Sequence, residues 1–83
     1  MAGRKRAEAE EADMRITDSK SFGAMLKYRR KQLGYTQAYI SEITGLSVSF
    51  LSELENGKKT AQLDKAIEVA MLLGLDLTME ARG

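Results

Sequence analysis

Short polar side chains gather near the middle of the chain, where they could bind phosphate oxygens and the edges of bases. The hydroxyls of Ser47, Ser49 and Ser52 can donate or accept hydrogen bonds, and Val48 can contact a thymine methyl group. Glu53 could accept a hydrogen bond from a cytosine amino group, or it could be an exposed bystander, because a carboxylate is unfavourable beside phosphates. This chemistry requires one rigid element that presents all five side chains.

Two short helices joined by a tight turn are predicted over residues 36–57. Thr36 and Ser47 are suitable N-caps, Gly45 lies in the turn, and Gly57 follows the second helix. Helices this short are unstable alone in water, so apolar side chains must lock them together. The predicted locking set is Ile40, Ile43, Leu46, Leu51 and Leu54. The best-known use of such a pair is to seat its second helix in the major groove of DNA.

Polar residues also flank the predicted second helix. Gln37 begins the first helix of the pair, where its amide can bond a phosphate or support a side chain of the second helix. Asn56, Lys58 and Lys59 follow the second helix, in a loop of the kind that holds phosphates without reading sequence. The alternative for each residue, taken singly, is an ordinary solvated position.

Two charged residues fall on the inner sides of predicted helices. Arg30 lies on the apolar side of the helix before the pair, and Glu55 lies near the inner side at the end of the second helix. A buried charge is tolerated only when it is paired. We therefore predict an ion pair between Arg30 and Glu55 with a structural, non-catalytic role.

A further helix is predicted on each side of this pair. Residues 18–21 offer N-caps for a helix that ends before Gly34 and buries Phe22, Leu26 and Leu33. The last helix is predicted at residues 62–73, and its apolar positions are Leu63, Ala66, Ile67, Ala70 and Leu73. Together these elements predict a mainly α-helical domain over residues 18–74.

The two ends of the chain differ from this helical region. Residues 1–17 are rich in charge and are predicted to form a flexible tail with a short extended segment at its end; a basic arm that contacts DNA is the alternative. Within residues 75–83, Leu75, Leu77 and Met79 alternate with polar residues, which predicts a β-strand. Because a lone strand has unpaired edges, we expect the same strand of a second subunit to pair with it across a two-fold axis.

Composition narrows the function classes. The chain has 83 residues, 43% of them hydrophobic, and a net charge of +1, which suits one small domain and argues neither for nor against nucleic acid. Without histidine, cysteine or a glycine-rich phosphate loop, we expect no enzyme activity, no metal site and no cofactor. No apolar run reaches the roughly 18 residues of a membrane span and no secretory signal is visible, so a cytoplasmic, nucleoid-associated protein is expected.

Three short motifs carry a family resemblance. RRKQLGYTQ at residues 29–37, GLS at residues 45–47 and LSELENGK at residues 51–58 resemble the Xre family of lambda-repressor-like helix-turn-helix regulators. The resemblance covers about residues 21–75. It implies a lambda-repressor-like four-helix domain that binds double-stranded DNA.

The resemblance also assigns roles to individual positions. It implies that Gln37 contacts the DNA backbone and supports base reading, and that the polar face of residues 47–53 meets the groove. Arg30 and Glu55 match an internal ion pair of the family. Ser41 replaces the usual alanine at a contact between the helices. The start of the second helix is less polar than in members that carry glutamines there, so the base preference does not transfer.

The end of the chain narrows the resemblance further. Many Xre domains close with a fifth helix, whereas this chain continues with GLDLTMEAR. That ending resembles the HipB-like antitoxins, which are DNA-binding dimers that also bind a HipA-like kinase toxin and repress their own operon. The resemblance implies a homodimer, an inverted-repeat operator and a toxin partner.

Two other functions remain open from the sequence. One is a stand-alone phage-type repressor or a restriction–modification controller, which would bind DNA without a toxin. The other is a protein-interaction module whose helix pair docks a partner and binds no DNA. The salt dependence of binding separates the last from the others, because each neutralised phosphate contributes a slope of about −0.9 on duplex DNA.

Overall fold

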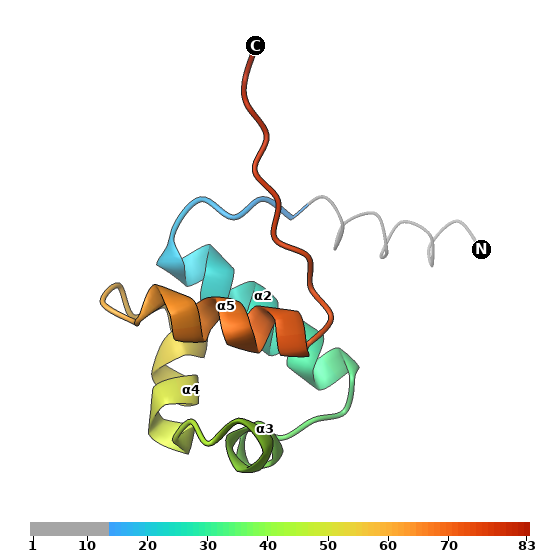
Figure 1. Cartoon of the computed structure of the whole chain (residues 1–83), viewed down its shortest axis with the longest axis vertical. Coiled ribbons are helices and arrows are strands. Elements are labelled where there is room, and N and C mark those ends of the chain that lie inside the picture. The colour runs from blue at the N-terminus through green and yellow to red at the C-terminus, as the bar shows by residue number, and fades with distance from the viewer. Residues whose placement is uncertain (1–13) are drawn as a thin grey trace, which may run out of the picture.

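Four α-helices make up the part of the chain that the computed structural model describes, residues 14–83 (Figure 1). They are α2 at Ser19–Gln32, α3 at Gln37–Thr44, α4 at Val48–Glu55 and α5 at Leu63–Leu72. The four helices that the sequence predicts are confirmed. None of the described helices is long and apolar enough to cross a membrane. The prediction of a flexible tail falls mainly on residues 1–13, outside the described residues.

Side-chain caps begin three of these helices. Asp18 and Ser21 form a capping box on α2, in which the Asp18 carboxylate accepts a hydrogen bond from the Ser21 backbone N–H at 2.8 Å. The hydroxyls of Thr36 and Ser47 accept hydrogen bonds from the first turns of α3 and α4, at 3.0 and 2.9 Å. Each bond satisfies a backbone donor that has no partner within its helix. The predicted cap residues therefore set where the helices start.

One apolar core lies between the four helices. Its buried members come from every helix and from the residue after α5: Leu26, Ile40, Leu51, Leu54, Ala66, Val69, Ala70 and Leu73. Phe22, Leu46, Phe50, Ala61 and Leu75 are partly buried and pack against it. The helix α4 packs against both α2 and α3. This packing supplies the stability that helices of eight residues lack on their own.

Three residues that were predicted to lie in the core are exposed: Leu33, Ile43 and Leu63. Each lies at the end of a helix, where the neighbouring helices no longer cover its apolar face. Val69 is buried although the sequence analysis did not place it in the core. It shares a helical face with Ala66 and Ala70, which were predicted correctly.

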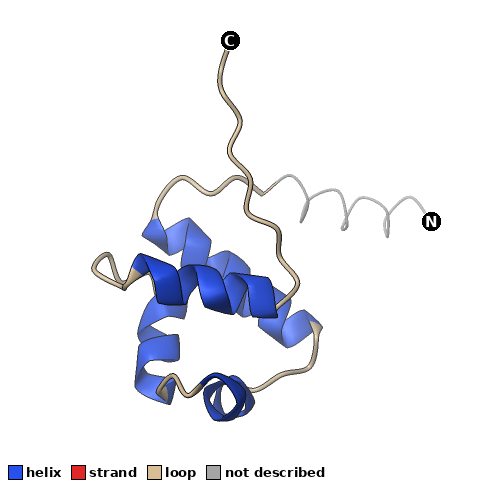
Figure 2. Cartoon of the chain, in the orientation of Figure 1, coloured by secondary structure: helices blue, strands red, loops and turns tan. Residues whose placement is uncertain are grey.

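The predicted C-terminal strand is wrong for the single chain. The described residues contain no strand, and residues 75–83 form a loop that runs away from the helices (Figure 2). Leu75 packs partly against the core, whereas Leu77 is exposed and Met79 is 99% exposed. A strand needs a neighbouring edge for its backbone hydrogen bonds, and the described part of one chain offers none. Pairing with a second subunit stays a prediction.

Two side chains of α2 hold the ends of other helices. The Ser19 hydroxyl donates to the carbonyl of Gly57, just after α4, at 3.0 Å. Arg29 donates from Nε to the carbonyl of Leu73, just after α5, at 2.9 Å. Because helix ends have carbonyl groups without internal partners, these bonds satisfy acceptors that the core would otherwise leave open. The helix α2 is thereby tied to the segments that directly follow α4 and α5.

The capping box makes the acid stability of the fold depend on Asp18. The hydrogen bond from the Ser21 backbone holds the pKa of the Asp18 carboxyl below 3.8, its ordinary value. Because the folded pKa is lowered, ionised Asp18 stabilises the fold above that ordinary value, and this stabilisation is lost as the pH falls through the folded pKa. We expect Asp18→Ala to lower the urea midpoint at neutral pH and to lower it less in acid.

Asp18→Asn is the matched control, since asparagine keeps a capping oxygen but cannot titrate. It should retain most of the stability at neutral pH and flatten the dependence on pH. An alanine variant with the same deficit at neutral and strongly acidic pH would contradict the role of the charge.

Candidate nucleic-acid interface

A tight, glycine-containing turn joins α3 to α4 and fixes their relative orientation. Gly45 ends α3 with a backbone φ of 80°, in the left-handed region that glycine adopts readily. The Thr44 hydroxyl donates to the carbonyl of Ile40 at 2.7 Å and accepts from the backbone of Leu46 at 3.1 Å. Ile40 is buried against Leu51 and the rest of the core. The pair of helices is therefore a rigid unit.

The first turn of α4 presents three of the predicted contact residues to solvent. Ser47, Val48 and Ser49 are all exposed, while Ser52, one turn later, is half-buried. The Ser47 oxygen accepts the capping bond from Phe50, which leaves its O–H free to donate to another group. The structure thus places Ser47, Val48 and Ser49 together at the start of α4, with Ser52 one turn further along.

The other predicted contact residues follow at the end of α4 and in the loop beyond it. Asn56 is the C-cap of α4, and Lys58 and Lys59 are both exposed. Lys58 Nζ lies 3.1 Å from the Oε1 atom of Glu53, and both side chains are about half exposed. Glu53 is therefore an exposed residue held by a lysine, and its negative charge is partly balanced before any ligand arrives.

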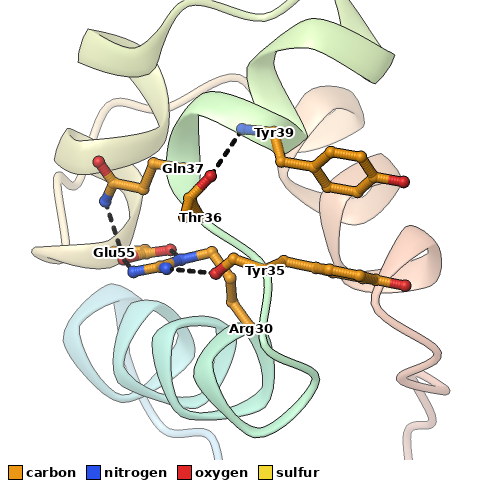
Figure 3. Close-up of polar contacts among 6 residues, drawn as sticks. All are labelled: Arg30, Tyr35, Thr36, Gln37, Tyr39 and Glu55. Carbon is orange, nitrogen blue, oxygen red and sulfur yellow. Dashed lines mark hydrogen bonds and ion pairs between the residues drawn. The ribbon is translucent and has the colours of Figure 1, made fainter.

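A polar network beneath this surface ties three helices together (Figure 3). Arg30 Nε donates to Oε2 of Glu55 at 2.6 Å, and Arg30 Nη2 donates to Oε1 at 3.0 Å. The side chains of this pair are only 11% and 8% exposed. Arg30 Nη1 also donates to the carbonyl of Tyr35 at 2.8 Å. The structure brings together the two residues for which an ion pair was predicted.

The carboxylate of Glu55 accepts hydrogen bonds from both Arg30 and Gln37. Its hydrogen bond to Arg30 outweighs the cost of burial and raises the pKa of the guanidinium, so the arginine stays charged. Gln37 Nε2 donates to Oε1 of Glu55 at 3.0 Å. Figure 3 shows the amide oxygen of Gln37 turned away from Glu55. Because an amide nitrogen carries two donors, Gln37 supports α4 and still has a donor and an acceptor free to act outward.

Sequence reasoning missed the aromatic pair beside this network. The rings of Tyr35 and Tyr39 lie with centroids 5.0 Å apart and are tilted by 40°. Both rings are partly exposed and point away from Gln37 (Figure 3). The spacing of four residues would suggest contact within one helix, but Tyr35 precedes α3, so the contact depends on the loop. The role of the Tyr35 carbonyl as an acceptor was equally invisible in the sequence.

Residues 26–79, which include α3 and α4, match a family described as helix-turn-helix. The chain belongs to this helix-turn-helix family. Its helix-turn-helix is the unit formed by α3, the turn at Gly45 and α4. The match extends from α2 into the C-terminal segment, so it includes the elements that pack around the helix pair.

Three curated relatives share the family's sequence pattern. The chain is 32% identical over 69 residues to an uncharacterized HTH-type transcriptional regulator, y4mF, of Sinorhizobium fredii, covering 83% of this chain and 91% of that protein. It is 32% identical over 64 residues to the ImmF control region 10 kDa protein of Bacillus phage phi105, covering 77% of this chain and 71% of that protein. An uncharacterized HTH-type transcriptional regulator of Haemophilus influenzae is 36% identical over 63 residues, which cover 76% of this chain and 62% of that protein.

A solved structure shares the fold. A chain of the HipB-O4 20mer complex superposes with a TM-score of 0.74, covering 83% of this chain and 97% of that chain. The two sequences are 22% identical, so the likeness concerns the arrangement of the helices.

Proposed function

We propose that this protein is a sequence-specific DNA-binding regulator that represses transcription. The observation that carries the proposal is the rigid helix pair, whose second helix exposes Ser47, Val48 and Ser49 at its start. Lys58 and Lys59 extend the exposed surface beyond its end. Membership of the helix-turn-helix family and the likeness to proteins named HTH-type transcriptional regulators support it.

In this proposal α4 enters the major groove with its N-terminal end first. Val48 and Ser49 then contact base edges, with Ser52 beside them, while Lys59 and the loop backbone bind phosphates. Gln37, held by Glu55, offers its free donor and acceptor to a phosphate or a base. Lys58 shields the carboxylate of Glu53 from the phosphates. The interface contains few positive charges, so one copy should bind weakly and two copies should bind cooperatively to adjacent half-sites.

The finer part of the proposal concerns assembly and partners. We propose a homodimer that binds an inverted repeat with half-sites about 34–36 Å apart, or a multiple of that distance. We further propose that the dimer is an antitoxin, acting in the cytoplasm, which neutralises a HipA-like kinase and represses its own operon. The fold shared with HipB and the exposed apolar side chains of Leu77 and Met79 support this part.

A stand-alone phage-type repressor is the second candidate, because a phage control-region protein is as similar in sequence as the first bacterial relative. Co-expression with the product of the neighbouring gene separates the two functions. A kinase-like neighbour that co-purifies with this chain and loses its kinase activity supports the antitoxin. Operator binding by a chain that binds no such kinase favours the stand-alone repressor.

The variants Lys59→Ala and Val48→Ala test the two kinds of DNA contact. Lys59→Ala should weaken binding to operator and scrambled duplexes alike and reduce the slope of log K against log salt by about 0.9 per copy. Val48→Ala should leave that slope unchanged because it removes no phosphate contact. It should lower the ratio of operator affinity to scrambled-duplex affinity, because it removes a contact with a base. Fluorescence anisotropy across a salt series measures both. A nearly flat slope for the unmodified chain would contradict DNA binding and favour a protein-interaction module.

A further inference from the structure

A large groove lies on the side of the domain where the two ends of the described chain meet. It has a volume of about 1310 Å³ and is lined by residues 14–16, by α2 residues such as Met25, and by residues 75–82. Sites for small molecules occupy about 300–1,000 Å³, so this groove is large enough for a stretch of polypeptide. Its lining mixes charged side chains with exposed apolar ones, among them Met14, Ile16 and Met79.

The backbone groups of the C-terminal wall of this groove are exposed and have no hydrogen-bond partner within the described chain. The last backbone hydrogen bond of the described chain joins Leu75 to Ala70, and none involves residues 76–83. Asp76 and Arg82 form no ion pair with any described residue. An extended segment with free N–H and C=O groups, apolar residues at alternate positions and unpaired charges is suited to pairing with another strand.

We infer that the C-terminal segments of two copies pair antiparallel over this groove, with Met79 directly opposite Met79 of the second copy. The inference rests on the proposed homodimer and adds its register. In this register Asp76 lies opposite Arg82 of the second copy, and the same pair recurs on the other side of the axis. Leu77 lies opposite Ala81, so apolar side chains share one face and opposite charges share the other.

The neighbouring registers are less favourable. Placing Thr78 on the axis sets Asp76 against Glu80 of the second copy, and placing Glu80 on the axis sets two carboxylates directly opposite, both of which are repulsive. Placing Leu77 on the axis leaves Arg82 without an acidic partner. A shift of one residue between the strands would mix apolar and polar side chains on each face. Charge therefore selects the register centred on Met79.

Cysteine cross-linking tests the register directly, because the chain contains no cysteine of its own. Directly opposed residues of an antiparallel pair have Cα atoms about 4.5–5.5 Å apart, which is within disulfide range. Met79→Cys in the full chain should therefore form a covalent dimer under mild oxidation. Leu77→Cys is the matched control, since its two copies would lie about 13 Å apart along the strands and should not cross-link.

Charge exchange gives an independent readout by sedimentation equilibrium. Asp76→Arg or Arg82→Asp alone should raise the dimer dissociation constant about tenfold, because two attractive pairs become repulsive. The double variant should return it close to the original value.

A dimer in which Leu77→Cys cross-links instead, or in which neither variant does, overturns the register and leaves the homodimer standing. A chain that remains monomeric at every concentration overturns the homodimer itself.

Discussion

Glu55→Ala is expected to cost about 3–5 kcal/mol of folding free energy, a large part of the stability of a domain this small. The substitution leaves the Arg30 guanidinium buried without its carboxylate partner, while Gln37 also loses the acceptor that holds it. The lost hydrogen bonds matter less than the uncompensated charge, which cannot be neutralised because arginine does not deprotonate. Urea unfolding followed by circular dichroism measures the loss.

Two further variants show whether burial of the charge is the cause. Glu53→Ala breaks the half-exposed ion pair with Lys58 and should cost less than about 1 kcal/mol. The double variant Arg30→Met with Glu55→Leu removes both charges, and it should recover much of the loss because buried ion pairs exchange for apolar residues at little cost. A single Glu55→Ala variant as stable as Glu53→Ala would contradict the central role of the network.

Much of the fold could be predicted because its signals are local. Thr36 and Ser47 stand where a hydroxyl can reach the third backbone N–H of a helix, and that geometry depends only on spacing within a few residues. Gly45 marks the turn for the same kind of reason. The contact between Arg30 and Glu55 is long-range, yet it could be predicted because a charge on an apolar face needs a partner.

The features that the sequence analysis missed depend on what neighbouring helices cover. Ile43 and Leu63 fit a helical apolar pattern, but they lie at helix ends beyond the core. Apolar and polar residues alternate after Gly74 with the period of a strand, but a strand also needs the edge of a neighbouring strand for its backbone hydrogen bonds. The bond from Arg29 to Leu73 joins two surfaces that only the packed structure brings together. Local patterns gave the helices, and tertiary contacts decided which residues were buried.

Gly23→Ala is expected to destabilise the domain by about 2–3 kcal/mol, although alanine favours helices over glycine by about 0.5–1 kcal/mol. A Cβ atom at Gly23 would overlap the carbonyl oxygen of Leu54 and lie 2.7 Å from that of Glu55. Both are backbone atoms, so no change of rotamer can relieve the overlap. The methyl group must push α2 away from α4, which disturbs the packing of the core and lengthens the ion pair between Arg30 and Glu55.

Gly34→Ala separates this crowding from the ordinary cost of replacing glycine. Gly34 has a φ of 79° and no atom within 4 Å of an added Cβ, so its cost is the backbone strain of about 1–2 kcal/mol. Because Gly23→Ala displaces α4, it should also weaken operator binding under conditions where the chain remains folded, whereas Gly34→Ala should bind normally. Equal stability of Gly23→Ala and the unmodified chain in urea would show that α2 and α4 do not approach this closely.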